Sequence, residues 1–287
     1  KQLEILVDSV EGVQQAVKTP VDRIVFGDPL HRIPVPQTAY EEIVHLCREA
    51  NKTIIFSTPR VIKDNESTAF KEMVVHMVQA KPDGIRVHFL GALEVLRQLG
   101  YTGVVEGDTG LQTFNSHTLG ILNDLGFSTV NVSLEATLHQ MNMMANKGIM
   151  PIGAIVQGRV ELMISEYCPI SSFAGTGYKR GCPLVCTKKD YALQDRKGEL
   201  FPIYTDPFCR THIMNSRELD MKSYIDDLRR SGLQRLVIDG RQRSPKWIAK
   251  EMSMYHQLLE GTVKAPSKEG ATHITRGHFF KGILGES

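Results

Sequence analysis

The stretch TGVVEGDTGLQTFNSHTLGILNDLGFSTVNVS (residues 102–133) contains the unit from which most of the chain is built. A short apolar run, TGVVEG, is followed by the amphipathic stretch SHTLGILNDLG and then by a second apolar run, STVNVS. Runs that are apolar throughout, rather than alternating, are typical of strands buried on both faces of a parallel sheet. A glycine that ends a helical stretch just before the next strand is a common helix C-cap. The stretch therefore predicts a β–α–β unit.

The same succession of apolar and amphipathic stretches continues along the chain. Eight apolar runs are strand candidates: LEILV (3–7), RIVFG (23–27), KTIIFST (52–58), GIRVHF (84–89), TGVVEG (102–107), STVNVS (128–133), IGAIVQGRVELMIS (152–165) and RLVIDGR (235–241). Most of them precede an amphipathic stretch long enough for a helix. Eight such units in about 260 residues fit a closed, TIM-type (β/α)8 barrel better than an open doubly wound sheet. We therefore predict an α/β fold of this architecture.

One segment, residues 165–221, does not follow this pattern. It has no clean periodicity, is too long for an ordinary barrel loop, and contains four of the five cysteines. Loops of this length are usually functional or organised by a ligand. No repeat or low-complexity linker divides the chain elsewhere. We expect a single barrel domain over residues 1–287, with this irregular cysteine-bearing segment as a long insertion near the seventh strand.

The composition is that of a globular protein without a membrane span. Of the 287 residues, 41% are hydrophobic, and no apolar run approaches the roughly 18 residues that a spanning helix needs. The N-terminus shows no basic region followed by an apolar stretch, so we expect a cytoplasmic location. The first residue is Lys1 rather than Met, which indicates a segment of a longer polypeptide whose remaining domains would be its partners.

The net charge of +2 neither requires nor excludes a polyanion such as RNA as a partner, because phosphate binding needs a local patch rather than a large total charge. Three short basic runs are candidates for such a patch: YKRG (178–181), TKK (187–189) and DGRQRSPK (239–246). A solvated protein surface is the alternative explanation for each of them.

The cysteines fall into two groups. Cys47 lies within the amphipathic stretch EEIVHLCREA and is expected to be a small buried residue. Cys168, Cys182, Cys186 and Cys209 lie within 42 residues, and the middle two have C-x3-C spacing. This grouping favours a metal site, with disulfides or unrelated thiols as the alternatives. Four cysteines alone do not separate structural zinc from an iron–sulfur cluster, although zinc is slightly favoured.

A series of motifs resembles peptidase family U32, the collagenase-like peptidases. In chain order they are GRVELMISEYCPI, RGCPLVC, YALQDRKGELFPI, CRTHIMNSREL and RLVIDGRQRSPKWIAKEMSMY. The resemblance extends upstream through STPRVIKD, GLQTFNS and VNVSLEAT and downstream to the tail TRGHFFKG, so it covers essentially the whole chain. It implies one domain of a longer bacterial member of this family.

The resemblance carries three further implications. The fold is a TIM-barrel-like domain, which agrees with the count of strand candidates. The family's four cysteines, matched here by Cys168, Cys182, Cys186 and Cys209, bind a 4Fe–4S cluster, which moves the preferred metal from zinc to iron. Several family members take part in oxygen-independent hydroxylation of tRNA, of ribosomal RNA or of a ubiquinone precursor. RNA, a small molecule or a protein is therefore the expected substrate.

Hydrolytic motifs are missing from the sequence. None of the ten histidines lies in an H-E-x-x-H motif, and no G-x-S-x-G motif occurs. Their absence favours an iron–sulfur enzyme of hydroxylation or RNA modification. A peptidase of unassigned catalytic type and a zinc-stabilised binding scaffold remain the alternatives.

Polar residues near the ends of the predicted strands are the candidate site residues, because TIM-barrel enzymes bind substrates at the carboxyl ends of their strands. Glu135 and Glu161 are the candidate proton-transfer groups. Substrate contacts are expected from Arg60, Asn115, Gln157, Arg159, Asp239 and Arg241, since arginine can bind a carboxylate or phosphate with two hydrogen bonds. Ion pairing among the charged residues and a helix N-cap at Asn115 are the alternatives. We expect a polar pocket next to the cysteines.

Overall fold

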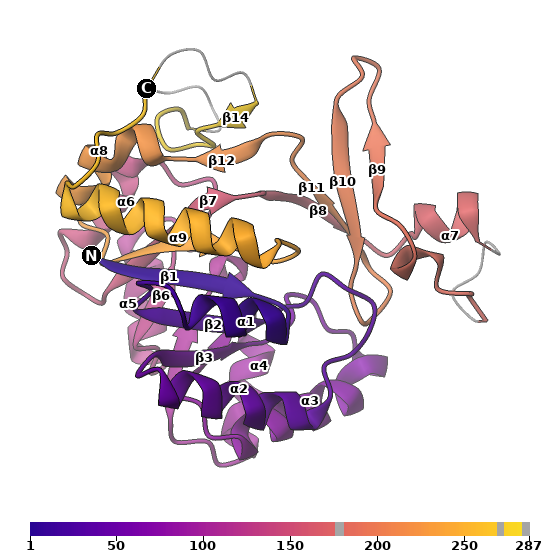
Figure 1. Ribbon diagram of the computed structural model, residues 1–287. Helices are drawn as coiled ribbons and strands as arrows, with labels where there is room; N and C mark the ends of the chain where they lie inside the picture. Colours follow the sequence, from indigo (N-terminus) through magenta and orange to yellow (C-terminus); the bar gives the residue numbers. More distant parts are fainter. Residues whose placement is uncertain (176–180, 269–272, 283–287) are drawn as a thin grey trace.

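The computed structural model describes residues 1–175, 181–268 and 273–282, so that Tyr178, Lys179 and Arg180 of the run YKRG lie outside the described residues. Within these ranges eight parallel strands form a barrel (Figure 1): β1 (Gln2–Val7), β2 (Arg23–Gly27), β3 (Thr53–Ser57), β4 (Gly84–Val87), β5 (Val104–Gly107), β6 (Thr129–Asn131), β7 (Ile152–Gly158) and β13 (Arg235–Asp239). The barrel is closed because β13 pairs with both β1 and β7. The predicted (β/α)8 architecture is confirmed.

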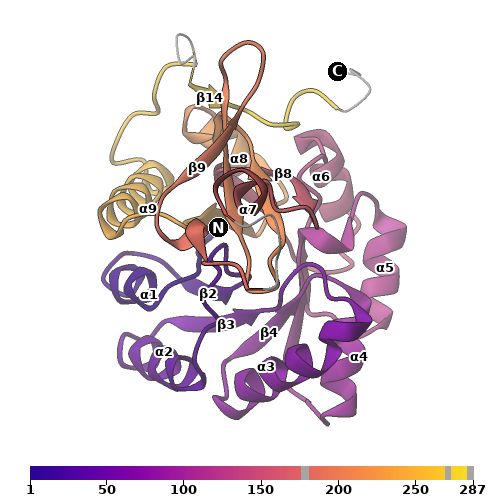
Figure 2. The same cartoon turned by 90° about the vertical axis from the view of Figure 1, so that its right-hand side faces the viewer.

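Helices between the strands cover the outside of the barrel (Figure 2): α1 (Val10–Ala16), α2 (Gln37–Glu49), α3 (Ser67–Gln79), α4 (Leu90–Gln98), α5 (Ser116–Asp124), α6 (Leu138–Ala145), α8 (Ile225–Arg230) and α9 (Pro245–Glu260). The longest, α9, begins where the Ser244 hydroxyl accepts a hydrogen bond from Trp247 N and Pro245 occupies the first turn. It ends at Gly261, whose φ of 74° permits the left-handed cap. Short 3-10 turns are η1 (Asp64–Glu66), η2 (Thr109–Leu111), η3 (Val185–Thr187) and η4 (Lys222–Tyr224).

Successive residues of each barrel strand point alternately outward, toward the helices, and inward, into the barrel. Residues such as Ile5, Ile24 and Phe56 belong to the main apolar core, which the helices help to form. Their neighbours in sequence point the other way, into the barrel. There Leu6, Val25 and Ile55 form a small apolar cluster of their own, and charged residues fill other positions. The charged groups inside the barrel therefore belong to strand residues that point inward.

A second sheet lies beyond the carboxyl ends of the barrel strands (Figures 1 and 2). It is antiparallel, with the order β8 (Glu161–Ser165), β11 (Thr211–Met214), β10 (Leu200–Thr205) and β9 (Tyr191–Gln194). The helix α7 (Pro169–Ala174) and η3 lie at the outer side of this sheet (Figure 1). The expectation of an irregular segment over 165–221 is thus wrong for much of its length. Its strands β9, β10, β11 and β12 (Glu218–Asp220) are only three to six residues long, and β9 is largely exposed, so they give no long apolar run to detect.

The predicted strand 152–165 is two strands in two sheets. It breaks at Gly158, whose φ is 126° and where an added Cβ would lie 2.7 Å from Cβ of Asp239. Only glycine fits this close approach and this backbone conformation. The chain turns there and leaves the barrel, so Arg159 follows β7 and Glu161 begins β8. Placing both residues along the seventh barrel strand was therefore wrong.

Two further strands extend the barrel sheet. β12 (Glu218–Asp220) pairs antiparallel with β7, and β14 (Ile274–Thr275) pairs with β12. This brings the tail residues 276–280 to the rim of the barrel near β7. In the described ranges, no helix has the length and apolar character required to span a bilayer.

Candidate active site and cysteine centre

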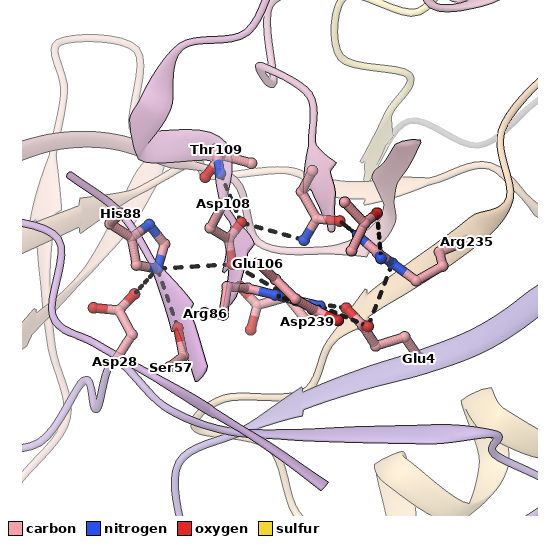
Figure 3. Close-up of polar contacts among 12 residues, drawn as sticks. Glu4, Asp28, Ser57, Arg86, His88, Glu106, Asp108, Thr109, Arg235 and Asp239 are labelled. Atoms are coloured by element: carbon pink, nitrogen blue, oxygen red, sulfur yellow. Dashed lines mark hydrogen bonds and ion pairs between the residues drawn. The ribbon is translucent and has the colours of Figure 1, made fainter. Parts of the chain in front are cut away.

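A layer of buried ion pairs fills the barrel below its mouth (Figure 3). Arg86 is fully buried; its Nη1 lies 2.6 Å from Glu4 Oε1 and its Nη2 lies 2.7 Å from Glu106 Oε2. Burial alone would raise the pKa of Glu4, but the guanidinium groups of Arg86 and Arg235 outweigh burial and lower it. Both carboxylates thus face positive charge, and this layer forms the floor of the site.

His88 directly follows β4 and lies close to Asp28, Ser57 and Asp108 (Figure 3). Its Nε2 lies 3.3 Å from Ser57 Oγ, 3.7 Å from Asp108 Oδ2 and 3.9 Å from Asp28 Oδ2. Burial lowers the pKa of His88 despite these carboxylates, which favours the neutral ring. All three neighbours face one ring nitrogen, and Nδ1 has no hydrogen-bond partner within the described residues. A Ser–His–Asp triad instead binds its carboxylate at Nδ1, so this group does not have triad geometry.

Asp239 and Arg241 meet Asp28 beside this histidine. Arg241 Nη2 lies 2.8 Å from Asp239 Oδ2, and Nη1 pairs with the Asp28 carboxylate. Burial would raise the pKa of Asp28, but nearby positive charge, with Arg241 the largest contributor and Arg60 a further one, brings it to about 2. Arg241 is therefore engaged by two carboxylates. Asp239 and Arg241 are thus paired with each other in the structure, which corresponds to the ion-pairing alternative given for them above.

A second chain of charged groups links the barrel to the second sheet. Arg60 Nη1 donates to Glu161 Oε1 over 2.6 Å, and His212 Nδ1 lies 2.6 Å from Glu161 Oε2. The other ring nitrogen of His212 lies 3.5 Å from Asp206 Oδ2. Burial opposes ionisation of Glu161, but Arg60 and His212 together lower its pKa. Glu161 is thus ionised near neutral pH with both oxygens engaged, so it is poorly suited to act as a general acid.

His212 is expected to make folding stability depend on pH above neutrality. Burial lowers its pKa, but the carboxylates of Asp206 and Glu161, which favour the protonated ring, outweigh burial and raise it from 6.5 to about 9. A raised histidine pKa stabilises the fold fully below about pH 6.5, and this stabilisation is lost as the pH rises through about 9. We predict a loss of about 3 kcal/mol in unfolding free energy over this interval that a His212→Gln variant lacks. Urea unfolding at pH 6, 7.5 and 9 measures it. The exposed His139→Gln is the matched control, and equal pH profiles for wild type and His212→Gln would contradict the prediction.

Glu135, Glu161 and Arg60 line one cavity of about 340 Å³. It lies between the ends of β6 and β7, the strand β8 and the tail residues His278 and Phe279. No cysteine lines this cavity. The expected polar pocket therefore exists around these three residues, but it is not the cavity that borders the cysteines.

The remaining predicted substrate contacts lie apart from that cavity. Asn115 is an exposed N-cap of α5, where its Oδ1 accepts a hydrogen bond from Thr118 N over 3.0 Å. Gln157 is buried and donates to Glu218 Oε1 over 2.8 Å. Arg159 Nη1 donates to the carbonyl oxygens of Asn215 and Ser216. Asn115 is thus a helix N-cap, which was the alternative to a substrate contact.

The four clustered cysteines gather at one end of the second sheet. Thr205, Thr211 and Ser165 are directly paired neighbours across β10, β11 and β8. Cys168 follows this row by three residues and Cys209 precedes Thr211 by two. The thiol of Cys186 interacts with the Thr205 hydroxyl at the end of the same row. The segments that carry these cysteines therefore meet at one end of the second sheet.

The electrostatics of Cys186 show how close its neighbours are. Burial raises the pKa of this thiol, the Thr205 hydroxyl opposes the rise, and Cys168 and Cys182 add to it. All five thiols are described, half-buried except for buried Cys47, and none is paired. In the part of the chain that the structure describes, no three His, Cys, Asp or Glu side chains are positioned to hold a metal ion together. The donor set suits a tetrathiolate centre chemically, but the thiols are not at ligating positions.

A basic groove borders this cysteine centre. One cavity of about 390 Å³ is lined by Cys186, Arg32, Lys188 and Lys189 among others. A larger open cavity of about 740 Å³ shares Asp190 and Tyr204 with it. The second cavity adds the cations Arg159, Lys197 and Arg243, the anion Glu199 and the ring of Tyr191. We call the two together the basic groove, because its cations outnumber its anions.

Sequence reasoning missed Asp28, His88 and His212. The signal for the first two was present, since Asp28 follows the run RIVFG directly and His88 is the second-last residue of the run GIRVHF. The rule that selected the other strand-end residues applies equally to them. His212 had no such signal, because it lies in a strand of the second sheet that the sequence did not predict.

A closed parallel barrel with polar side chains gathered at the carboxyl ends of its strands has the architecture of the TIM-barrel enzymes. The sequence model of peptidase family U32 matches residues 8–278, and the chain belongs to this family. No curated protein sequence matches the chain.

Several solved structures resemble the chain at low sequence identity. Thiamine phosphate pyrophosphorylase from Pyrococcus furiosus is 9% identical with a TM-score of 0.50, over 92% of this chain and 97% of that one. The U32 peptidase Mk0906 is 14% identical with a TM-score of 0.44, over 60% of this chain and 73% of that one. The YdjI aldolase from Escherichia coli K12 is 9% identical with a TM-score of 0.44, over 91% and 89%. At these identities the first similarity supports the barrel fold alone.

Proposed function

We propose that this chain is an iron–sulfur enzyme of family U32 that hydroxylates RNA without molecular oxygen. One observation carries the proposal: the cavity lined by Cys186 shares Asp190 and Tyr204 with a neighbouring cavity that is lined by several cations and two tyrosines. A redox centre and a polyanion-binding surface would thus be neighbours. Such an enzyme would work in the cytoplasm, within a longer chain.

The cysteine centre would hold the cluster. Cys168, Cys182, Cys186 and Cys209 would supply the four thiolates of a 4Fe–4S cluster, which provides electron transfer when bound. Metal binding commonly orders its ligands, so thiols that converge without touching suit a site that closes on loading. Zinc would use the same four thiols and is the alternative occupant.

The basic groove would hold the RNA strand. Lysine and arginine neutralise phosphates, and aromatic rings provide faces on which unpaired bases stack. Tyr191 and Tyr204 lie among the groove cations. Single-stranded RNA offers its bases for such stacking, whereas a duplex hides them. The groove would therefore present a base near the cysteine centre.

The overall hydroxylation reaction requires an oxygen-atom donor in addition to the RNA. Hydroxylation replaces a C–H bond of the base by a C–O bond. An oxygen-atom donor other than O₂ loses one oxygen atom and accepts the two electrons. The contribution of the chain itself is to bind the strand in the basic groove and to hold the mouth rigid through buried pairs such as Arg241 with Asp239.

The test is an anaerobic assay on RNA. Cluster-loaded protein is incubated with transfer and ribosomal RNA, and digested nucleosides are analysed by mass spectrometry for one added oxygen atom. A hydroxylated pyrimidine that disappears when the four cysteines are replaced by serine supports the proposal. Unmodified RNA together with gelatin cleavage that survives the same substitutions would instead support the peptidase alternative.

Two groove lysines are expected to contribute directly to RNA binding. Lys188 and Lys189 form no ion pair within the described residues, so their charges are available to phosphates. Replacing both by alanine is expected to weaken binding and to reduce the magnitude of the slope of log affinity against log salt by about 1.4, which is about 0.7 for each lost phosphate contact on a single strand. Fluorescence anisotropy with a single-stranded RNA oligonucleotide between 50 and 200 mM salt, about the range where this slope is usually read, measures both effects. Lys147→Ala with Lys250→Ala removes the same charge elsewhere, and an equal loss there would contradict the assignment.

A further inference from the structure

Cys209 lies in a tight turn with an unusual backbone. The turn Asp206–Cys209 joins β10 to β11, and Cys209 has a φ of 62°, in the left-handed region. Its N–H donates to the Asp206 carbonyl over 3.0 Å, and Asp206 N donates to the carbonyl of Arg210 over 3.0 Å. A non-glycine residue in this region costs free energy and persists only where neighbours hold it. The direction in which Cys209 presents its thiol is therefore fixed by what holds this turn.

Arg210 is the residue that holds it. Its side chain is 1% exposed, and its backbone N donates to Asp206 Oδ1 over 2.7 Å. Its guanidinium lies over the ring of Phe208, 5.4 Å from the centroid. An almost fully buried arginine beside a cysteine turn is costly unless its charge is paired.

Asp206 of the same turn lies close to that charge, with its Oδ2 3.7 Å from Arg210 Nη1, and two further partners lie on other segments. Arg210 Nε donates to Glu166 Oε1 over 2.7 Å, and Nη2 pairs with the Glu66 carboxylate. Glu166 precedes Cys168 by two residues, and Glu66 belongs to the barrel loop after β3. Glu166 also pairs with Lys63 of that loop over 2.6 Å. One side chain thus joins the Cys209 turn, the segment leading to Cys168 and the rim of the barrel.

We propose that Arg210 is a positioning residue that fixes the separation of Cys168 and Cys209 and anchors the cysteine centre to the barrel. The inference rests on the proposed cysteine centre, since only there does the separation of these thiols matter for function. Arginine suits the role because its planar fork reaches two carboxylates at once, whereas lysine provides one point charge. A lysine at position 210 keeps the charge but cannot tie both glutamates in this geometry.

The experiment measures the separation in the metal-free protein. In a background with Cys47, Cys182 and Cys186 replaced by alanine, Cys168 and Cys209 are cross-linked with bifunctional thiol reagents of increasing spacer length. Arg210→Met and Arg210→Lys are each expected to lower the cross-linking rate at the shortest effective spacer about tenfold, because the effective concentration of one thiol near the other falls. Glu166→Gln keeps a neutral acceptor and is expected to lie between wild type and Arg210→Met. Monofunctional labelling of each thiol serves as the accessibility control.

A matched charge removal separates this role from a general effect. Arg217 follows β11 in the chain and pairs with Glu199 over 3.3 Å, with its side chain 51% exposed. Arg217→Met is expected to cross-link like wild type. Should Arg210→Met fail to fold by circular dichroism, Glu166→Gln decides the matter with the arginine in place.

The outcomes distinguish this inference from the proposed function. An unchanged spacer profile in folded Arg210→Met, or in folded Glu166→Gln where Arg210→Met does not fold, would overturn the positioning role whether or not wild type binds iron. A full restoration by Arg210→Lys would reduce the role to buried charge and would also overturn it. Slower cross-linking in a chain whose wild type takes up no iron would leave the positioning role standing and refute the cluster.

Discussion

Replacing Cys186 by serine is expected to lower the iron and sulfide content of the protein at least about tenfold. Cys186 lies near two other members of the cysteine set, since both Cys168 and Cys182 raise the pKa of its thiol. A cluster needs thiolate ligands, and a serine hydroxyl leaves the set one thiolate short. Iron and acid-labile sulfide are measured after anaerobic reconstitution, together with the visible spectrum.

The fifth cysteine provides the control. Cys47 is buried in α2, and burial, with a smaller contribution from the charge of Asp83, raises its pKa to about 12. Such a thiol is a packing residue rather than a ligand. Cys47→Ala is expected to bind as much iron as wild type. Equal iron content in Cys186→Ser and Cys47→Ala would contradict the assignment of Cys186 as a ligand.

Replacing Arg86 by methionine is expected to cost at least about 3 kcal/mol of unfolding free energy at pH 7. The methionine fills much of the space but removes the fully buried one of the two arginines, Arg86 and Arg23, that pair with both Glu4 and Glu106. Removing one partner of a buried pair leaves a buried charge uncompensated, which is what makes the loss large. Urea denaturation followed by circular dichroism measures it.

The pH dependence of this loss identifies its origin. Arg86 and Arg235 keep the pKa of Glu4 below its ordinary value of 4.5 in spite of burial, so the stabilisation is present above that pH and is lost as the pH falls. The difference between wild type and Arg86→Met is therefore expected to shrink below about pH 4.5. Arg230→Met, which removes an exposed pair with Asp227, is expected to cost less than about 1 kcal/mol. Similar losses in both variants would contradict the account of the barrel interior.

The barrel could be predicted because its signal is local. Strands such as β2 and β13 are continuous apolar runs, and the helices between them are marked by caps such as Ser244. The second sheet could not be predicted in the same way. β9 (Tyr191–Gln194) is largely exposed, so burial imposes no periodicity on it, and its pairing with β10 depends on contacts distant in sequence.

The location of the candidate site could be predicted from the sequence, but the hydrogen bonds and ion pairs between its residues could not. Glu161 and Arg60 were found as polar residues near strand ends, yet their hydrogen bond spans 101 residues of sequence. The ion pair of Arg86 with Glu4 likewise depends on closure of the barrel, which places distant strands in contact. Spacing alone grouped the four cysteines, but only the paired row of Thr205, Thr211 and Ser165 explains why they share one edge.

The most direct test of the cluster is the metal content of the wild-type chain purified without oxygen. Iron, zinc and acid-labile sulfide are quantified per chain alongside the visible spectrum. The proposed centre predicts a brown protein with about four iron and four sulfide per chain. A colourless protein with about one zinc per chain and no sulfide would contradict it and would favour the zinc-stabilised scaffold.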